Sequence, residues 1–524
     1  MKDCHAEFAG LRSEMSRWLA QSMRVDGPGP NGGGEDEANY SLAWFPHYIV
    51  DGDEAVPGHF RSLLDALAGW VERECYQGYE PEAEAHHGTE PFLLFLPRYL
   101  GLFPEDRRAR SLLEDAARHI GNWGDGVPDW YDYERNCFHH YRIGSRVVGS
   151  DAGEAFEVAE HFRFLHIALA AYRVTGEQRY FDWSLRYGAE WARRLNAAAP
   201  GPLPVVWTQD GEGIYERDLT RRQKGMSAAS HHVEGDPLVG VEVLLASGAI
   251  YALADLSSLT GDAAFRAAAR RIVEPLVPGL TDPYADPGVA AVARYRLAFS
   301  DDSLDDDIRA QVERLPDESA DELAMTFPQE RRRVTPGVGR RNDMIHWGRR
   351  SADGVITPAD DPCTAALALA YQVTGDVGYA TRAFRQARVK LMMALRVLRG
   401  GREHADMGGA VCSVAAGHGR NWGIGAVTGC YGALALGTRE QMGRVTPIVE
   451  IADADGAHGI PAGVLPLVRP SVCGGGQVAF YNASPRTTDF AWRRAGDDEW
   501  GAFALDPGEP KTVLLGPNAE EIRR

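Results

Sequence analysis

The feature that most constrains the fold of this chain is a short turn motif that occurs three times. The copies read Thr175-Gly176-Glu177, Thr260-Gly261-Asp262 and Thr374-Gly375-Asp376. Each copy ends an apolar segment with helical spacing, and each is followed within four residues by an aromatic side chain that opens another helical segment. A unit of helix, turn and helix that repeats along a chain is typical of an array of helical hairpins.

The two helices of each hairpin differ in their pattern. The segment before the turn is apolar on nearly all sides, as in a helix buried from both sides, and the segment after it is amphipathic. In 177–195 the apolar stripe is formed by Phe181, Leu185, Gly188, Ala192 and Leu195. We expect inner helices near 40–45, 91–102, 154–174, 237–259, 361–373 and 421–437. We expect outer helices near 57–75, from the 103–106 turn to 120, and near 177–195, 262–276, 376–398 and 3–24, which makes six of each kind.

This alternation resembles the (α/α)6 toroid of the six-hairpin glycosidases and polysaccharide lyases, and the three turn motifs carry the resemblance. It implies a mainly α-helical domain over 1–444, closed by the helix at 3–24, with an Asp- and Arg-rich insertion at 277–359. From 445 to 524 the segments are short, alternating or β-branched and separated by Gly and Pro, which predicts a small antiparallel β domain. The motif is specific for helical hairpins and not for one activity, because toroids with other functions share this topology.

Composition argues against several classes of partner. The chain has 55 Lys and Arg against 74 Asp and Glu, a formal net charge of -19 and no long basic run, which disfavours nucleic acid. It contains no run of about 18 apolar residues, so we expect no membrane span. The first residues lack the apolar core of a secretory signal, which predicts a cytoplasmic protein. Seven scattered cysteines favour reduced thiols, and the oligomeric state stays open.

Titratable side chains gather in the segments that lead into the inner helices. If these helices all run in the same direction, their leading segments meet at one rim of the toroid. Nine of the 16 histidines lie there, namely His86, His87, His139, His140, His231, His232, His346, His404 and His418, and none lies in the three turn motifs. Helix N-termini also favour anionic groups. We therefore expect the active site at this rim.

Two of these segments place a histidine just before a glutamate, His87-Gly88-Thr89-Glu90 and His232-Val233-Glu234, and Asp236 follows the second. Cleavage of a glycosidic bond requires a proton donor and a base or nucleophile on opposite sides of the sugar. We therefore expect Glu90, Glu234, Asp236 and His232 to hydrolyse an acidic, uronate-containing oligosaccharide. The histidine pairs at 86–87 and 231–232 fit helix caps or buried polar groups equally well.

Other residues of the rim are candidates for holding this oligosaccharide. The set is His86, His87, His140, Arg142, His231, Asn342, Asp343, His346, Trp347, Arg402, His404, His418 and Arg420. Tyr141 supports an alternative reaction, β-elimination by a lyase, which needs a Tyr or His base and an Asn, His or Arg that stabilises the uronate carboxylate. Tyr141, His140, Arg142 and Asn342 can provide this set. Tyr141 and Arg142 also fit a purely structural loop. A noncatalytic glycan-binding toroid is the second alternative.

Metal and cofactor chemistry finds little support in the sequence. Asp301-Asp302-Ser303-Leu304-Asp305 matches the Asp-Asp-x-x-Asp pattern with which terpene cyclases hold magnesium, but it lies in an Asp-rich segment without a second metal motif downstream. The histidines lack zinc-site spacing such as His-Glu-x-x-His. We expect neither a metal nor a cofactor.

Overall fold

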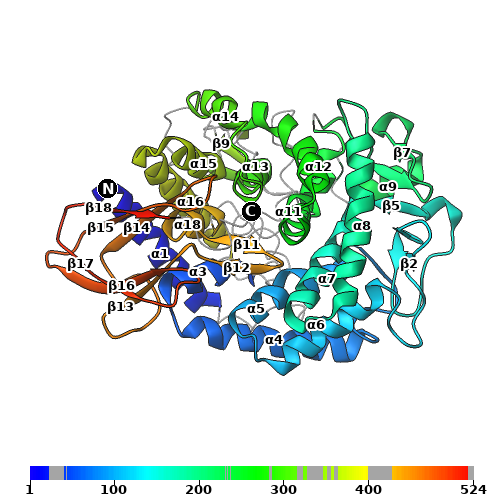
Figure 1. The fold of residues 1–524 in the computed structure, drawn as a ribbon, viewed down its shortest axis with the longest axis horizontal. Helices are drawn as coiled ribbons and strands as arrows, with labels where there is room; N and C mark the ends of the chain where they lie inside the picture. The colour runs from blue at the N-terminus through cyan, green and yellow to red at the C-terminus, as the bar shows by residue number, and fades with distance from the viewer. Residues whose placement is uncertain are drawn as a thin grey trace.

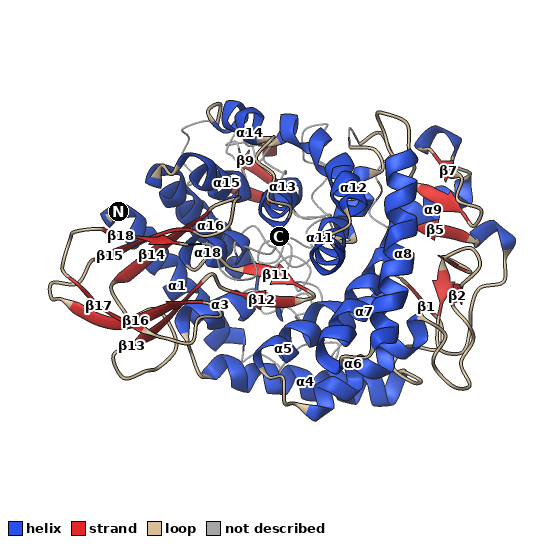
Figure 2. Cartoon of the chain, viewed as in Figure 1, coloured by secondary structure: helices blue, strands red, loops and turns tan. Residues whose placement is uncertain are grey.

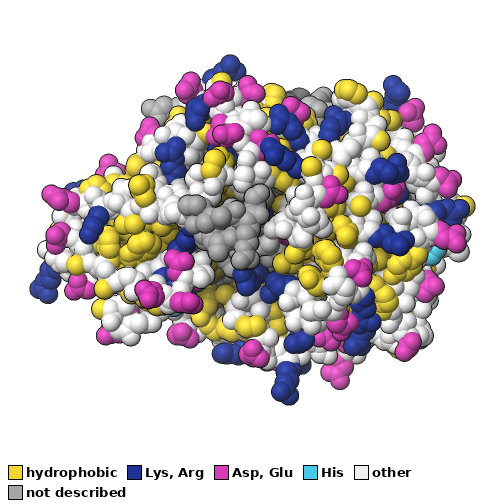
Figure 3. Space-filling model, in the orientation of Figure 1, with side chains coloured by type: hydrophobic (Ala, Val, Ile, Leu, Met, Phe, Trp, Pro, Cys, Tyr) yellow, Lys and Arg dark blue, Asp and Glu magenta, His cyan; other side chains and the backbone are white. Residues whose placement is uncertain are grey.

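The computed structural model describes residues 1–22, 41–42, 44–85, 87–229, 232, 234–236, 238–281, 286–315, 323–326, 346–350, 356–358, 364–398 and 428–516. Within these residues the chain is mainly helical, and its strands form sheets of two or three strands each (Figure 2). No helix in this part of the chain is long and apolar enough to cross a membrane. Acidic and basic side chains of the described residues are interspersed over the face drawn in Figure 3.

Most helices follow one another as pairs joined by short turns. The first members are α3 (Trp44–Asp51), α5 (Leu96–Leu102), α7 (Phe162–Thr175), α11 (Ala249–Thr260) and α15 (Thr364–Thr374). The second members are α4 (Ala55–Glu74), α6 (Arg107–Ile120), α8 (Gln178–Ala197), α12 (Ala263–Val273) and α16 (Val377–Leu398). The last helix, α18 (Thr428–Ala435), packs on α3, and α1 (Lys2–Ser22) packs on α16, so the two ends of the helical region lie side by side. In Figure 1, α5, α7, α11 and α18 lie nearer the middle than α4, α6, α8 and α12.

The three turn motifs share the same internal bonds. In each, the threonine hydroxyl donates to the carbonyl four residues earlier at 2.7 to 2.8 Å and accepts from the backbone N–H two residues later at 3.1 to 3.2 Å. The glycines Gly176, Gly261 and Gly375 have φ angles of 73°, 72° and 78°, the left-handed conformation that commonly ends a helix. Asp262 then accepts from the N–H of Ala264 at 2.8 Å and caps the next helix. The local sequence therefore reverses the chain within a few residues.

Burial separates the two kinds of helix. In α7 every residue from Phe162 to Ala171 is buried, whereas α8 buries one face. The large rings on that face are Tyr180, Trp183, Tyr187 and Trp191. The predicted stripe is therefore displaced, because Phe181 and Leu185 are only partly buried. Large aromatic rings remove more apolar area from water than these two side chains do, and they set the orientation of the helix.

The segment predicted as an insertion contributes a further helical pair. α13 (Asp286–Ala298) packs on α11 and α15, and α14 (Asp305–Val312) packs on α15. The pair therefore lies among the other hairpins (Figure 1). The sequence count of six omitted it because α13 lacks one clear apolar stripe and the segment around α14 is rich in Asp.

The aspartates of this segment form ion pairs. Asp301 accepts from the Tyr295 hydroxyl at 2.5 Å and pairs with Arg266 at 2.9 Å. Asp305 pairs with Arg296 at 2.5 Å through parallel contacts of both oxygens. These partners give the Asp-Asp-x-x-Asp motif a structural role, because they join α12, α13 and α14.

The strands of the C-terminal region form two antiparallel three-stranded sheets. One contains β13 (Val449–Asp453), β16 (Thr488–Arg494) and β17 (Gly501–Leu505), and the other contains β14 (Val464–Pro470), β15 (Gly476–Asn482) and β18 (Lys511–Leu515). The ring of Phe480 on β15 lies 5.3 Å from that of Phe490 and 5.1 Å from that of Phe503, which joins the sheets. Whether 445–524 is a separate domain stays a prediction.

The turn glycines give a first testable prediction. We expect Gly261→Ala to lower the free energy of unfolding by about 1 to 2 kcal/mol, because the added Cβ disfavours the left-handed backbone although no neighbouring atom blocks it. Chemical denaturation measures the change. The control is Gly58→Ala, at an exposed position inside α4 with open space around it, which we expect to leave stability unchanged or raise it. Equal losses in both variants would contradict the assigned role of the turn.

Candidate functional site

A cavity of about 930 Å³ lies where three segments that precede buried helices meet. The first segment contains β1 (Ala83–Glu84), which pairs antiparallel with β4 (Arg142–Ile143) from the second. The third contributes α9 (Arg221–Ala229), which contacts η3 (Ala152–Glu154) of the second. These segments lead into α5, α7 and α10 (Val241–Ala246), the helix just before α11. The predicted convergence is therefore present for these three segments.

The wall of the cavity is rich in charge. Its acidic residues are Glu80, Glu82, Glu84 and Glu154, and its basic residues are Arg142, Arg221 and Arg222. Arg142 pairs with Glu82 at 2.9 Å and with Glu154 at 3.5 Å. Arg222 pairs with Glu154 at 2.5 Å, and the hydrogen bonds that it donates to Glu154 and Asp151 raise the pKa of Arg222. Arg221 is exposed and forms no ion pair with any residue that the structure describes.

Tyr141 forms part of this wall and is 6% exposed. Its hydroxyl donates to Glu84 at 3.4 Å. Burial raises the pKa of Tyr141 well above its usual value, and the charges of Glu84 and Glu160 raise it further. The phenol therefore stays protonated at neutral pH and can donate a hydrogen bond, whereas removal of a substrate proton would require the phenolate.

His140 is next to Tyr141 in sequence but does not line the cavity. Its Nδ1 accepts from the backbone N–H of Arg142 at 2.9 Å, and its Nε2 lies 3.1 Å from the carbonyl of Asp151. Since the N–H of Arg142 can only donate, these partners fix the tautomer with the proton on Nε2. The histidine holds the turn that presents Tyr141 and Arg142.

Glu90 lies behind the cavity, at the start of the π-helix η2 (Pro91–Phe95) that precedes α5. It pairs with Arg163 of α7 at 3.0 Å, and both side chains are 3% exposed. Glu160, one turn before Arg163, is fully buried in η4 (Ala159–His161). Farther along α7, Nε2 of His166 donates to the carbonyl of Ser247 at 3.2 Å, and burial lowers the pKa of His166 to about 3. The buried face of α7 therefore carries polar side chains, Arg163 and His166.

His232 is buried between two glutamates. Its Nδ1 contacts the carboxylate of Glu242 on α10, and its Nε2 lies 3.0 Å from that of Glu216. Burial acts to lower the pKa of His232, but the hydrogen bonds and charges of Glu242 and Glu216 outweigh burial and raise this pKa. These contacts favour the protonated imidazole and tie the segment at 232 to the start of α10.

The two acidic residues that follow His232 have different surroundings. Glu234 is 71% exposed and pairs with Lys224 at 2.6 Å, and this hydrogen bond lowers the pKa of Glu234. Asp236 is 2% exposed and accepts from the N–H of Leu238 at 2.9 Å, which shapes the entry to α10. Neither residue lines the cavity.

The structure therefore brings some predicted site residues together and leaves others apart. Tyr141 and Arg142 share the cavity wall, whereas Glu90, Glu234, Asp236, His232 and His140 do not belong to it. Eight candidates lie outside the described residues, namely His86, His231, Asn342, Asp343, Arg402, His404, His418 and Arg420. His87 is described only as part of η1 (His87–Thr89), and His346 and Trp347 only as part of β9 (His346–Arg350). Their roles stay predictions.

Sequence reasoning missed other groups of the region. Glu160, Arg163 and Glu242 carried a usable signal, because each is a charged residue at the start of an otherwise apolar helix. Glu84 and Arg221 carried none, because they stand in polar segments among many similar residues. Among the described residues no three or more His, Cys, Asp or Glu side chains are arranged to hold a metal ion.

The His232 contacts predict a pH-dependent contribution to stability. Because the folded protein binds this proton more tightly than the unfolded chain, the contribution is complete below about pH 6.5 and is lost as the pH rises through the folded-state pKa. We expect His232→Gln to lower the free energy of unfolding by about 3 kcal/mol near pH 6, since it removes the charge between two carboxylates. The loss should shrink toward pH 9 in denaturation experiments. A loss that is independent of pH in His232→Gln would refute the assignment.

Comparison with known proteins adds two weak structural likenesses. No family model and no curated protein matches the chain. An unsaturated glucuronyl hydrolase specific for heparin is 12% identical, with a TM-score of 0.41 over 74% of this chain and 98% of that chain. A cellobiose 2-epimerase from Bacillus thermoamylovorans is also 12% identical, with a TM-score of 0.32 over 52% of this chain and 88% of that chain. TM-scores this low do not establish a shared fold or function. The fold and the site described above rest on the contacts within this chain.

Proposed function

We propose that the helical pairs close into a toroid of hairpins, with α13 and α14 as an additional pair, and that the chain is a carbohydrate-active enzyme. The proposed reaction is hydrolysis of a glycosidic bond in an acidic oligosaccharide bound in the cavity of about 930 Å³. The observation that supports it most is a wall with four carboxylates, three arginines and a protonated phenol. The volume lies within the range of roughly 300 to 1,000 Å³ that is typical of small-molecule sites.

The arginines support an acidic substrate. Arg142 and Arg222 are engaged with Glu82, Glu154 and Asp151, so they form a fixed part of the wall. Arg221 has no such partner among the described residues, and its guanidinium is available to a carboxylate of the substrate. Arginine pairs with a carboxylate through two parallel hydrogen bonds, which fixes the orientation of a uronate ring.

The carboxylates support acid and base catalysis. Glu84 is partly buried, lines the cavity and accepts from Tyr141, and we assign it as the group that exchanges a proton with the substrate. Glu154, which Arg142 and Arg222 hold in place, supplies the second carboxylate. These assignments replace Glu90, Glu234 and Asp236, which do not line the cavity. Hydrolysis requires two such groups on opposite sides of the bond that breaks.

Elimination by a lyase is the second candidate, because Tyr141 lies in the cavity beside Arg142. The raised pKa of Tyr141 opposes its use as the base. A screen of acidic oligosaccharides with mass detection separates the reactions, because hydrolysis adds one water to the summed products and elimination adds none. Products without the added water would overturn hydrolysis, and binding without any product would favour a glycan-binding protein.

We expect Glu84→Gln to lower kcat by about 100-fold or more on any oligosaccharide that the chain cleaves, because the amide cannot transfer the proton. Rates at saturating substrate measure the effect, and thermal unfolding shows whether the fold is kept. Glu74→Gln, an exposed change at the end of α4, is the matched control and should leave kcat unaltered. Full turnover by Glu84→Gln would remove this residue from the mechanism.

We expect Arg221→Ala to raise KM by about tenfold or more for an acidic oligosaccharide, since a hydrogen bond to a charged group contributes about 1.5 to 3 kcal/mol. KM for the reduced, neutral form of the same oligosaccharide should change little. Arg217→Ala is the control, because Arg217 is 85% exposed and does not line the cavity. An equal rise of KM for the acidic and the neutral oligosaccharide would show that Arg221 does not bind the acidic group.

A further inference from the structure

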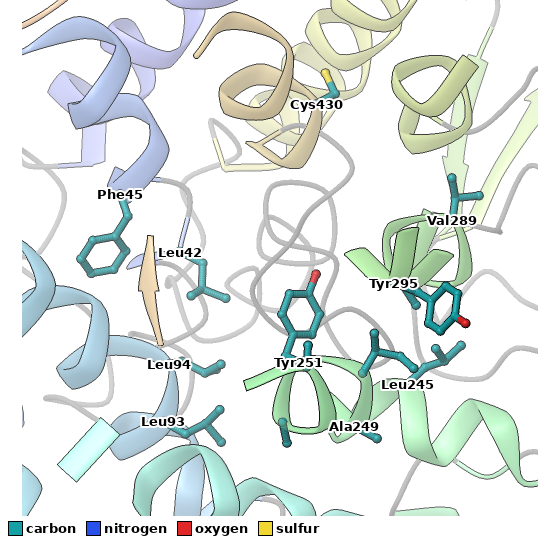
Figure 4. Close-up of a cluster of buried hydrophobic side chains, with 14 of the residues drawn as sticks. Leu42, Phe45, Leu93, Leu94, Leu245, Ala249, Tyr251, Val289, Tyr295 and Cys430 are labelled. Carbon is teal, nitrogen blue, oxygen red and sulfur yellow. The ribbon is translucent and has the colours of Figure 1, made fainter. Parts of the chain in front are cut away.

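A second cavity, of about 120 Å³, lies among the inner helices. Its walls come mainly from α13, α15 and α18, and the rest of the lining lies at the starts of α3 and α11, in α5 and in 438–445. Most of the lining is apolar and includes Leu42, Tyr251, Val289, Ala368, Leu369 and Cys430. Figure 4 shows that Leu42, Tyr251, Val289 and Cys430 surround the same central region. The cavity is separate from the one that carries the proposed function, and the two share none of their lining residues.

In the part of the chain that the structure describes, Gln372 and Arg294 each contribute to this lining a buried polar atom without a hydrogen-bond partner. The Oε1 atom of Gln372 is buried without a donor, and the residue is 8% exposed. The Nε of Arg294 is buried without an acceptor, although the guanidinium stacks on Tyr251 at 5.7 Å and lies 3.8 Å from Asp255. Leaving a buried donor or acceptor unsatisfied costs about 1 to 3 kcal/mol each, so native proteins rarely do so without a reason. α13 and α15, which carry these residues, pack against each other.

Arg98 and Glu440, which also line the cavity, pair with each other. Arg98 donates to both carboxylate oxygens of Glu440 at 2.8 and 2.9 Å. Arg98 also donates to the carbonyls of Leu93 and Leu94 at 3.2 and 2.6 Å. A ligand in this cavity could therefore supply a donor to Gln372 Oε1 and an acceptor to Arg294 Nε.

A hydroxyl group meets both demands, because it donates one hydrogen bond and accepts others. A carboxylate would satisfy Arg294 but would place a negative charge toward the carbonyl oxygen of Gln372. A purely apolar molecule would leave both groups unpaired. The apolar lining suits a flat apolar body, and an engineered apolar cavity of about 150 Å³ holds benzene. The best fit is a small aromatic molecule with one hydroxyl.

A further space adjoins this cavity. A space of about 70 Å³ shares Arg294, Gln372 and Arg439 with the first cavity. It extends to the loop from Ser471 to Gly475, where Ser471 is exposed. A small molecule therefore does not have to cross the charged cavity to reach the inner one.

We propose that this inner cavity is a binding site for a phenol-like molecule, whose ring occupies the apolar space and whose hydroxyl bridges Gln372 Oε1 and Arg294 Nε. The site is independent of the proposed hydrolysis, because it uses none of the groups assigned to that reaction. The ligand is defined by its chemistry, namely a six-membered aromatic ring with a single neutral hydroxyl.

The test compares phenol, toluene and benzoate on the full chain by isothermal titration calorimetry and by the shift in Tm. We expect phenol to bind one site and to raise Tm, and toluene to bind about tenfold more weakly because it leaves both polar groups unpaired. Gln372→Leu should reduce that preference for phenol over toluene severalfold. Ala290→Leu, which fills part of the cavity, should abolish binding of both, and Ala267→Leu at an exposed position on α12 should not.

Three results would overturn the proposal. Absence of any phenol binding would mean that the cavity holds only water. Equal affinity for phenol and toluene would mean that Gln372 and Arg294 do not recognise the hydroxyl. Tighter binding of benzoate than of phenol would mean that the cavity is an anion site. The Glu84→Gln variant should bind phenol like the unmodified protein, so failure of this site and failure of the proposed hydrolysis are distinguishable. If Gln372→Leu does not fold, the Ala290→Leu and Ala267→Leu pair still decides whether binding occurs in this cavity.

Discussion

The reversal of the chain at each Thr-Gly turn is the constraint on which the rest of this structure depends. An apolar helix such as α7 has to be covered on all sides, and the partner that follows it in sequence can cover it only if the chain turns back at once. A left-handed glycine does this without a side-chain clash, and the preceding threonine satisfies backbone groups at the break. Because these turns end the inner helices, the longer segments before them collect the charged residues, as β1, β4 and α9 do around the large cavity.

The interior also contains charged groups, and some of the buried pairs join elements that are distant in sequence. Arg98 of α5 binds Glu440 of β11 (Arg439–Gln441), and Arg163 of α7 binds Glu90 before η2. The N–H of Met442, in the turn after β11, donates to Asp255 of α11 at 2.7 Å. Such pairs cost desolvation energy, and an apolar pair of the same shape would often be as stable. Their benefit is specificity, because breaking one leaves a buried charge and so penalises other arrangements of the helices.

The sequence predicted the helices best where the local chemistry is self-contained. The turn motifs gave the ends of α7, α11 and α15 because a few adjacent residues determine them. The face of α8 was misjudged and α13 was counted as part of an insertion, because both depend on which neighbours a helix meets. In the site, Tyr141 and Arg142 were found from a distinctive segment. Glu84 was not, because only the pairing of β1 with β4 places it beside Tyr141.

The burial of Tyr141 allows its hydroxyl to donate a hydrogen bond and disfavours its use as a base. Its ring packs with Val158, Val206 and Met226 in a small apolar cluster, while its hydroxyl reaches Glu84 at the cavity. Burial and nearby carboxylates keep the phenol of Tyr141 protonated. The phenol can therefore donate a hydrogen bond to a carboxylate at the cavity, but it does not supply a phenolate base. In the proposed hydrolysis, proton transfer is thereby left to the carboxylates of the wall, and the cavity admits the water that this reaction consumes. Most of the inner cavity is lined by apolar side chains, and its Arg98–Glu440 pair is closed by two hydrogen bonds. The proposed phenol site therefore depends on apolar contact and neutral hydrogen bonds, whereas the proposed hydrolysis depends on charge.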